Sequence, residues 1–475
     1  KFYLTRLYFI HIPLKNKNDV LDIFESINNR GKKLNLTDTL RFISIKSYIN
    51  DQDKQNALND EWSKFYKNIE NQEKFFPDTD VFLERFINSM ATTEEGKSNP
   101  NGYTNDFDRI EFFKNKYSDN YLTGLKEINH ALATIDFIFD EQKFLSQIRE
   151  KTNEDESKVI ALIKLLELTF EISKNSHVLF IGYLSRIHNE SVHQSMVNSP
   201  NLEHHSTLLG FIWQFVKYVI AIEIYKNDDS NSVRTTFYGL AQKINESSIY
   251  DGENTSLNDL SKMNGNNETF VQNLAFQKFL GAQKKETTLL LYYFQFLHNY
   301  RELDTSSRIN YKSCDHIIPQ TWYNKSCWKD EIIDNWKLID EDDENSKRKY
   351  TQGLDLEDRY VKNVVNYMEN LWNDDDSKES FIQLIGNKVY IPGRTNSIKG
   401  NRCWVDEDDP RNSARAKLTE YFENNRNSSY AIPSYPQFHT LEKVNLHSVV
   451  KRTSFIIKTI CENSDKRFAS ISSNS

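Results

Sequence analysis

The chain is poor in cysteine, with four in 475 residues. No two of them form a CxxC pair, and the count is too low for the disulfide framework of a small secreted protein. We therefore expect a reducing cytoplasm as its compartment. A zinc knuckle built from Cys314, Cys327 and Cys403 with a histidine is disfavoured, because the paired ligand spacing of such sites is absent.

A long uncharged apolar run is also lacking. The most apolar stretch, residues 208–225, contains Gln214, Lys217 and Glu223. Because a membrane-spanning helix rarely tolerates two charges, this stretch predicts a buried helix and no membrane partner. Internal repeats of about 20 to 50 residues are absent, which argues against a solenoid. P-loop, HExxH and GxGxxG motifs are absent as well.

The chain has no excess of positive charge, since its formal net charge is −8. Binding of nucleic acid depends on where Lys and Arg lie, so any contact with DNA has to come from a local basic surface. One basic strip, residues 387–402, carries Lys388, Arg394, Lys399 and Arg402 and no acidic residue. We expect these four side chains to contact nucleic acid.

Aromatic residues are abundant, with a share of 13%. Length alone predicts about two to four domains. Residues 7–14 are β-prone, Asn18 is placed to cap a helix, and Thr37 with Asp38 predicts a second helix N-terminus. Apolar spacing up to about residue 305 predicts a helical scaffold. Its helices are expected at residues 58–70, 80–89, 121–139, 157–171, 178–187, 206–225 and 286–300.

After residue 305 the pattern becomes mixed, so the predicted fold class is α+β and predominantly helical. An insertion rich in Trp and acidic residues, 328–380, separates two β-prone runs. Its acidic runs, 341–344 and 374–376, predict solvated loops rather than metal ligands. The β-prone runs are 309–314 and 388–391, and helices are expected at 412–424 and 438–461.

Two short segments carry residue types suited to chemistry. Asp315 and His316 follow the first β-prone run, and Asn387 and Asn396 lie at and beyond the second. Hydrolysis of a phosphodiester needs an activated water, a cation and help for the leaving oxygen. A neutral His is a suitable general base, while Asp and Asn offer hard oxygen ligands for Mg²⁺. His316 alone is more typical of a structural histidine, so the combination favours a metal-assisted nuclease.

The segments DHIIPQTW and IGNKVYIPGRTNSIKGNR resemble the HNH (ββα-metal, His-Me finger) endonuclease motif, much as it occurs in RNA-guided CRISPR nucleases. The resemblance implies that His316 is the general base and that Asp315 and Asn396 hold one Mg²⁺ or Mn²⁺. It implies that Asn387 braces the loop carrying the base, and that Lys399 contacts phosphate or stabilises the leaving group. The insertion 328–380 departs from compact versions of the motif, and it carries either specificity or packing.

The N-terminal segment IFESINNRGKKL, followed by TDTLR, resembles the FExxNxRGxxL segment of GmrSD-type proteins. Those proteins join a ParB-like domain to a C-terminal HNH domain, and the helix around Arg452 resembles the closing helix of that domain. The resemblance implies a partial ParB-like domain at 1–50, a helical domain at 51–305 and an HNH nuclease domain at 306–475. The DGQQR-type signature linked to nucleotides is not found in these residues. Either it lies before Lys1, and an NTP cofactor binds through residues upstream of this chain, or it is absent, so NTPase activity stays open.

The resulting expectation is a metal-dependent DNA endonuclease of a bacterial anti-phage defence or modification-dependent restriction system. Its partners would be DNA, including modified phage DNA, and either a second protein or further copies of the chain. Two alternatives stay open. One is a nucleotide- or partner-gated DNA-sensing subunit with conditional nicking activity, and the other is an RNA-cleaving toxin, because metal chemistry does not itself choose the sugar.

Overall fold

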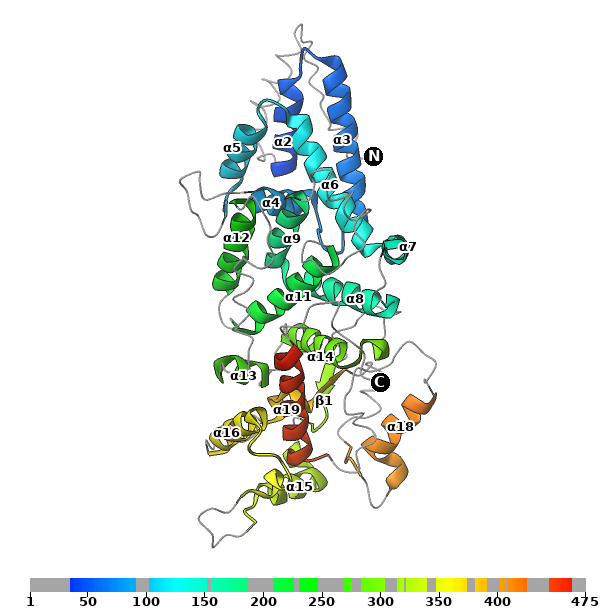
Figure 1. The fold of residues 1–475 in the computed structure, drawn as a ribbon, viewed down its shortest axis with the longest axis vertical. Helices are drawn as coiled ribbons and strands as arrows, with labels where there is room; N and C mark the ends of the chain where they lie inside the picture. Colours follow the sequence, from blue (N-terminus) through cyan, green and yellow to red (C-terminus); the bar gives the residue numbers. More distant parts are fainter. Residues whose placement is uncertain are drawn as a thin grey trace, which may run out of the picture. The chain divides into compact units, whose positions relative to one another are not determined.

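The computed structural model describes residues 35–90, 102–151, 155–186, 208–225, 230–246, 268–275, 283–303, 314–319, 322–339, 347–373, 381–390, 402–405, 409–424 and 444–463. These residues are predominantly helical, which confirms the coarse fold prediction (Figure 1). The chain divides into two compact units. Unit 1 comprises Lys1–Phe137, Val178–Glu190 and Tyr238–Glu246, and unit 2 comprises Ile138–His177, Ser191–Phe237 and Ser247–Ser475.

This division does not coincide with the expected limits at residues 50 and 305. Residues on both sides of position 305 belong to unit 2. The physical reason is packing, because helix α14 (Gln283–Asn299) packs both on α8 (Glu156–Ile172) and on the closing helix α19 (Leu446–Asn463). The last helix of the expected helical domain and the closing helix of the expected nuclease domain therefore share one interior.

Unit 1 has an aromatic interior. Trp62, Phe65 and Phe82 are almost completely buried, and Phe76 meets Phe82 edge-on with ring centroids 4.9 Å apart. Helices were expected at 58–70, 80–89, 121–139 and 178–187, whereas the helices at 106–117 and 230–246 were not expected. Unit 1 contains the whole of α2 (Leu36–Ser47), α3 (Gln52–Asn71), α4 (Thr79–Met90) and α5 (Asp106–Tyr117). It also contains most of α6 (Tyr121–Phe139) and of α9 (His177–Arg186), and half of α12 (Ser230–Glu246).

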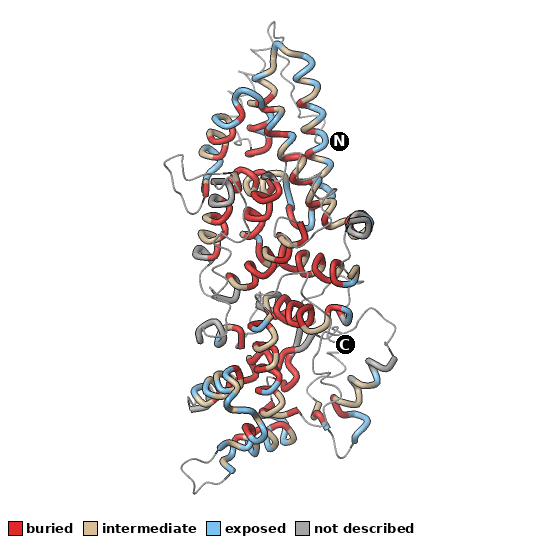
Figure 2. The backbone as a smooth tube through the Cα atoms, viewed as in Figure 1, coloured by how far each residue is buried: buried red, intermediate tan, exposed pale blue. Residues whose placement is uncertain are grey.

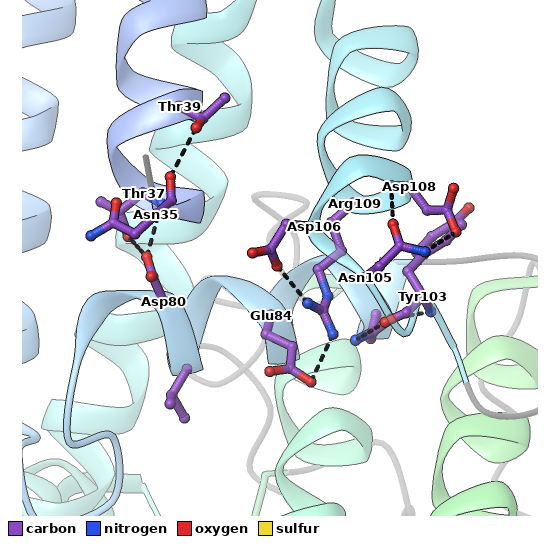
Figure 3. Close-up of polar contacts among 12 residues, drawn as sticks. Asn35, Thr37, Thr39, Asp80, Glu84, Tyr103, Asn105, Asp106, Asp108 and Arg109 are labelled. Carbon is purple, nitrogen blue, oxygen red and sulfur yellow. Dashed lines mark hydrogen bonds and ion pairs between the residues drawn. The ribbon is translucent and has the colours of Figure 1, made fainter. Parts of the chain in front are cut away.

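The start of α2 corrects the expected N-cap at Thr37 and Asp38. The cap is Asn35, whose side chain accepts a hydrogen bond from the Asp38 backbone N–H at 2.7 Å. Thr37 is buried and bonds instead to α4, with its backbone N–H 2.8 Å from Asp80 Oδ1 and its hydroxyl on the same carboxylate (Figure 3). The packing of α2 on α4 thus takes Thr37 out of the capping role.

The centre of unit 2 is a set of three packed helices, which we call the helical core: α8, α11 (Leu208–Tyr225) and α14. Figure 2 shows these helices mostly buried. Trp213 of α11 lies with its ring centroid 5.3 Å from that of Phe296 and 5.7 Å from that of Tyr293. The prediction of a buried helix at 208–225 is confirmed. Unit 2 also contains α7 (Glu141–Lys151) and α13 (Glu268–Ala275), which were not expected.

Among the described residues, no helix is long and apolar enough to cross a membrane.

Two short strands form an antiparallel pair in unit 2. Strand β1 (Cys314–His316) pairs with β2 (Lys388–Tyr390) so that Asp315 lies opposite Val389 and His316 opposite Lys388. The β-prone run predicted at 388–391 is thus a strand, while the other strand begins at the last residue of the run predicted at 309–314. Residues 309–313 lie outside the described part of the chain.

The insertion 328–380 contains folded structure. It includes most of α15 (Ser326–Trp336), the 3-10 turn η7 (Lys349–Thr351) and α16 (Arg359–Asn373), all of which pack on α19. Trp336 stacks on Tyr350 with centroids 5.3 Å apart, and the Arg348 guanidinium lies 4.7 Å from the Trp336 ring centroid. The insertion therefore contributes packing. Its acidic runs lie outside the described residues.

The C-terminal helices were expected at 412–424 and 438–461. The structure has α18 (Ala414–Asn424) and α19, which begins at Leu446 and ends at Asn463. Residues 438–443 lie outside the described part of the chain.

Candidate active site

The strand pair brings together the two segments that the sequence singled out. His316 ends β1, Lys388 begins β2, and the two residues face each other in the register of the sheet. The side-chain nitrogen Nζ of Lys388 lies 2.5 Å from His316 Nε2 and 2.6 Å from Gln383 Oε1. Gln383 Oε1 is in turn 3.5 Å from His316 Nε2. A compact triangle of three polar side chains results, with His316 4% and Lys388 0% exposed.

Asn387 ties the two segments together through its side chain. Its Oδ1 accepts a hydrogen bond from the Ile318 backbone N–H at 2.7 Å. Its Nδ2 donates to the carbonyl oxygens of Ile318 at 3.2 Å and Ile382 at 3.0 Å. One amide therefore satisfies three buried backbone groups, two of them just beyond His316. The chain that follows the histidine is held in place by a residue 69 positions away.

Helix α19 also supports this arrangement, through Arg452 and Thr453. Arg452 is buried, and its Nη1 donates to the carbonyl oxygens of Gly386 and Lys388, both at 2.6 Å. The Thr453 hydroxyl accepts from the Gly386 N–H at 3.0 Å. A Cβ at position 386 would collide with the Thr453 side chain and the Val449 carbonyl. The close approach of helix and turn therefore requires glycine.

Sequence reasoning missed Gln383, Gly386 and Thr453. Glycine within a β-prone run commonly marks a close approach of another backbone, so Gly386 carried a readable signal. Gln383 and Thr453 carried none, because their roles depend on packing between distant segments.

The expected metal ligands are only partly described. The backbone of Asp315 lies on β1 opposite Val389, but its side chain is outside the description, and so is the whole of Asn396. Arg394 and Lys399 also lie outside the described residues. In the described part of the chain, no group of three or more His, Cys, Asp or Glu residues is arranged to hold a metal ion.

The expected basic strip needs one correction. Lys388 is fully buried against His316, so it is not exposed to bind nucleic acid, because the strand register turns it toward the histidine. Arg402 is half-buried, and its Nε donates to Asn412 Oδ1 at 3.0 Å. Its backbone carbonyl accepts from the Trp328 indole N–H at 3.1 Å.

Two cysteines near this segment form a disulfide, Cys327 to Cys403, with Cα atoms 6.0 Å apart. The bond links α15 to the segment that follows the basic strip. The expectation drawn from low cysteine usage did not include such a pair, and a zinc site using these two thiolates is excluded while they are bonded. Since disulfides are typical of oxidising compartments, the cytoplasmic location stays a prediction that cysteine usage no longer supports.

A further cysteine, Cys461, is buried in α19. Burial raises the pKa of its thiol to about 12. Because the thiolate is the reactive form, this cysteine is an inert packing residue.

Residues 23–34, the first part of the segment that resembles GmrSD-type proteins, lie outside the described residues, whereas its second part, residues 37–41, lies in α2. No protein-family model, curated protein or solved structure matches the chain. Its function therefore has to be inferred from its own residues and their geometry.

Proposed function

We propose that the C-terminal part of the chain is a metal-dependent endonuclease of the HNH type that hydrolyses DNA phosphodiester bonds. The observation that carries the proposal is the β1–β2 pair with its Asn387 link and its supporting helix α19. The two strands and the helix bring together two segments that are about 70 positions apart. One segment carries Asp315 and His316, and the other carries Asn387. The finer assignment of this region as a ββα-metal domain is part of the proposal.

His316 is the proposed general base. Its position at the end of β1 is supported on two sides, by the opposite strand and by the Asn387 bonds to the chain just beyond it. An imidazole can accept a proton from water near neutral pH, provided that its ring is held in a productive orientation. The contacts with Lys388 and Gln383 restrict that orientation.

A divalent cation fits the donor chemistry of this place. Strand β1 sets Asp315 directly before His316, so a hard oxygen donor and the proposed base come from neighbouring positions. Asp315 and Asn396 would hold the ion. When bound, Mg²⁺ or Mn²⁺ would offset the negative charge that develops on the phosphate. Lys399 is proposed to stabilise the leaving oxygen, with Arg394 and Arg402 contacting the DNA backbone.

The biological setting that we propose is a bacterial defence or modification-dependent restriction system. Its support is the resemblance of both ends of the chain to GmrSD-type proteins, with a ParB-like front and an HNH end. An overall acidic chain has weak nonspecific affinity for DNA, which agrees with recognition of particular DNA through a dedicated surface.

The test is cleavage by the purified full chain. Plain plasmid DNA, the same DNA with modified cytosines, and single-stranded RNA would each be incubated with Mg²⁺, Mn²⁺ or EDTA. We expect nicked or linear DNA with metal and none with EDTA. His316→Ala should reduce the rate at least about 100-fold, the usual contribution of a general base. His130→Ala, on α6 of unit 1, is the matched control and should cut as the native chain does.

Each other outcome has a distinct meaning. A native chain that leaves every DNA uncut with both metals contradicts the nuclease proposal. Cleavage that survives His316→Ala contradicts the choice of base. Cleavage confined to RNA replaces the DNA substrate by RNA and favours the toxin alternative.

A further inference from the structure

The triangle of His316, Lys388 and Gln383 assigns a role that the motif does not include. We propose that Lys388, assisted by Gln383, is a positioning residue that holds the imidazole of His316 for proton transfer. The inference rests on the proposed function and deepens it. It also moves Lys388 from the expected set of DNA-contacting residues to the interior of the active site.

The first support is the register of the sheet. His316 and Lys388 are directly opposite each other in the antiparallel pair, and directly opposite side chains lie on the same face of a sheet. Lys388 Nζ reaches His316 Nε2 at 2.5 Å over this short span. The backbone pairing therefore places the two side chains within reach of each other.

The second support is the way in which Lys388 itself is held. Its head group donates to Gln383 Oε1 at 2.6 Å, and its backbone carbonyl accepts from Arg452 Nη1 at 2.6 Å. A long flexible side chain loses its rotamer freedom when its two ends are fixed, so it can act as a rigid support. Rotating the His316 ring away would break its contacts with both Lys388 and Gln383.

The third support separates this role from phosphate binding. Lys388 has no exposed surface, whereas a lysine that meets the DNA backbone has to reach solvent. Lys388 therefore acts on the rate of the reaction through His316 and leaves DNA affinity unchanged.

The test compares turnover with DNA affinity in Lys388→Met, which keeps the aliphatic stem and removes the amine. We expect kcat to fall about 10- to 100-fold, as is typical when a partner that orients a reactive imidazole is removed. DNA affinity, and its salt dependence, should stay unchanged. Lys217→Met is the matched control, because it removes another buried lysine of unit 2, which lies over Trp213 in α11. It should leave kcat unchanged.

The role is overturned by an unchanged kcat in Lys388→Met. It is also overturned by weaker DNA binding with a salt slope reduced by about 0.9, which is the signature of one lost phosphate contact. An equal fall of kcat in Lys217→Met would assign the loss to stability and overturn the role as well.

Two substitutions of Gln383 sharpen the test. Gln383→Glu keeps an oxygen acceptor for Lys388 Nζ, so we expect most of the native kcat. Gln383→Leu removes that acceptor and should lower kcat by a smaller factor than Lys388→Met does, because the direct contact with His316 remains. A Gln383→Leu chain with native kcat would remove Gln383 from the proposal.

Nitrogen NMR of the full chain with ring-labelled histidine separates this inference from the proposed function. The His316 signal is identified by its loss in His316→Ala. We expect the Nε2 resonance of His316 to move in Lys388→Met and to stay in Lys217→Met. If the native chain cuts no nucleic acid, the proposed function fails while a moved resonance still shows that Lys388 holds His316. An unmoved resonance contradicts the contact itself.

Discussion

The helical core and the candidate active site lie in the same unit but satisfy their buried polar groups differently. In the helical core, Thr169 bonds to the Leu165 carbonyl and Gln295 to the Asn299 carbonyl, each within its own helix and four positions away. In the candidate active site, Asn387 and Arg452 bond to backbone groups 64 to 69 positions away, besides the Asn387 bond to Ile382.

This difference shows where the chain specifies a unique arrangement. Apolar side chains of the helical core stabilise the fold because they are buried. The free energy gained is roughly proportional to the buried apolar area and does not depend on the direction of individual contacts. A bond from one buried amide to a distant backbone group has one correct geometry, and its loss leaves buried groups unpaired. We therefore expect stability to depend on both regions, and activity to depend on the second.

The largest expected effect tests this contrast with Asn387→Ala and Leu166→Ala. Asn387→Ala leaves the backbone groups of Ile318 and Ile382 without their partner, at a cost of about 3 to 5 kcal/mol. Leu166→Ala opens a cavity in α8, where this leucine is fully buried, and costs about 2 to 5 kcal/mol. Denaturant unfolding measures both. Under conditions in which both variants are still folded, only Asn387→Ala should reduce the cleavage rate, by at least about 100-fold.

The expected difference between the two regions is contradicted if both variants lose activity in proportion to their lost stability. Cleavage would then report only the folded fraction, and the bonds of Asn387 would have no separate part in the chemistry.

A smaller effect is expected from adding one methyl group at two glycines. Gly386→Ala forces a Cβ into Thr453 and the Val449 carbonyl, so we expect a loss of about 1 to 3 kcal/mol. Gly239→Ala lies inside α12, where a Cβ meets nothing within 4 Å. It should stabilise its helix by about 0.5 to 1 kcal/mol, because alanine loses less conformational freedom than glycine.

Thermal unfolding of the two glycine variants provides the measurement. A lower stability of Gly386→Ala together with a higher stability of Gly239→Ala supports the close packing of α19 on the η9 turn (Ile385–Asn387). A Gly386→Ala chain as stable as the native one would mean that the helix and the turn separate at little cost.

Local pattern was enough for much of the helical fold. Helix α6 was predicted with its observed limits, and α8 and α9 to within one residue at each end, because apolar periodicity needs only neighbouring residues. Helices α5, α7, α12 and α13 were missed. In α5 and α7 the few apolar positions stand among many charged ones, so both helices are polar on average.

The candidate site was predictable in its residue types and much less in its contacts. The motif located His316 and Asn387 in segments that the structure does bring together. It could not place Lys388 against His316, because that contact depends on strand register across 72 positions. The Cys327–Cys403 bond spans 76 positions and follows no spacing rule. Long-range partners of this kind are set by packing, which one sequence does not display.

The smallest expected effect concerns Asp358, which connects the insertion to α19. Its Oδ1 accepts from the backbone N–H of Tyr360 at 2.9 Å, at the start of α16, and its Oδ2 lies 2.7 Å from Lys458 Nζ. Burial raises the pKa of this carboxyl, but the bonds from Lys458 and from the backbone outweigh it and hold the pKa below its ordinary value of 3.8. The carboxylate therefore stabilises the fold above that pH, and the contribution is lost as the pH falls through the lowered pKa.

Asp358→Asn keeps the backbone acceptor and removes the charge that meets Lys458. We expect it to cost about 0.5 to 1 kcal/mol at pH 7, a small value because the lysine is 44% exposed. The difference between native and variant stability should shrink below about pH 4, where the carboxyl takes up its proton first in the unfolded chain and then, at the lowered pKa, in the native chain. Denaturant unfolding across this pH range measures it. A difference that stays constant down to pH 2 would mean that charge has no part in joining α16 to α19, so that this contact would resemble the helical core rather than the active site.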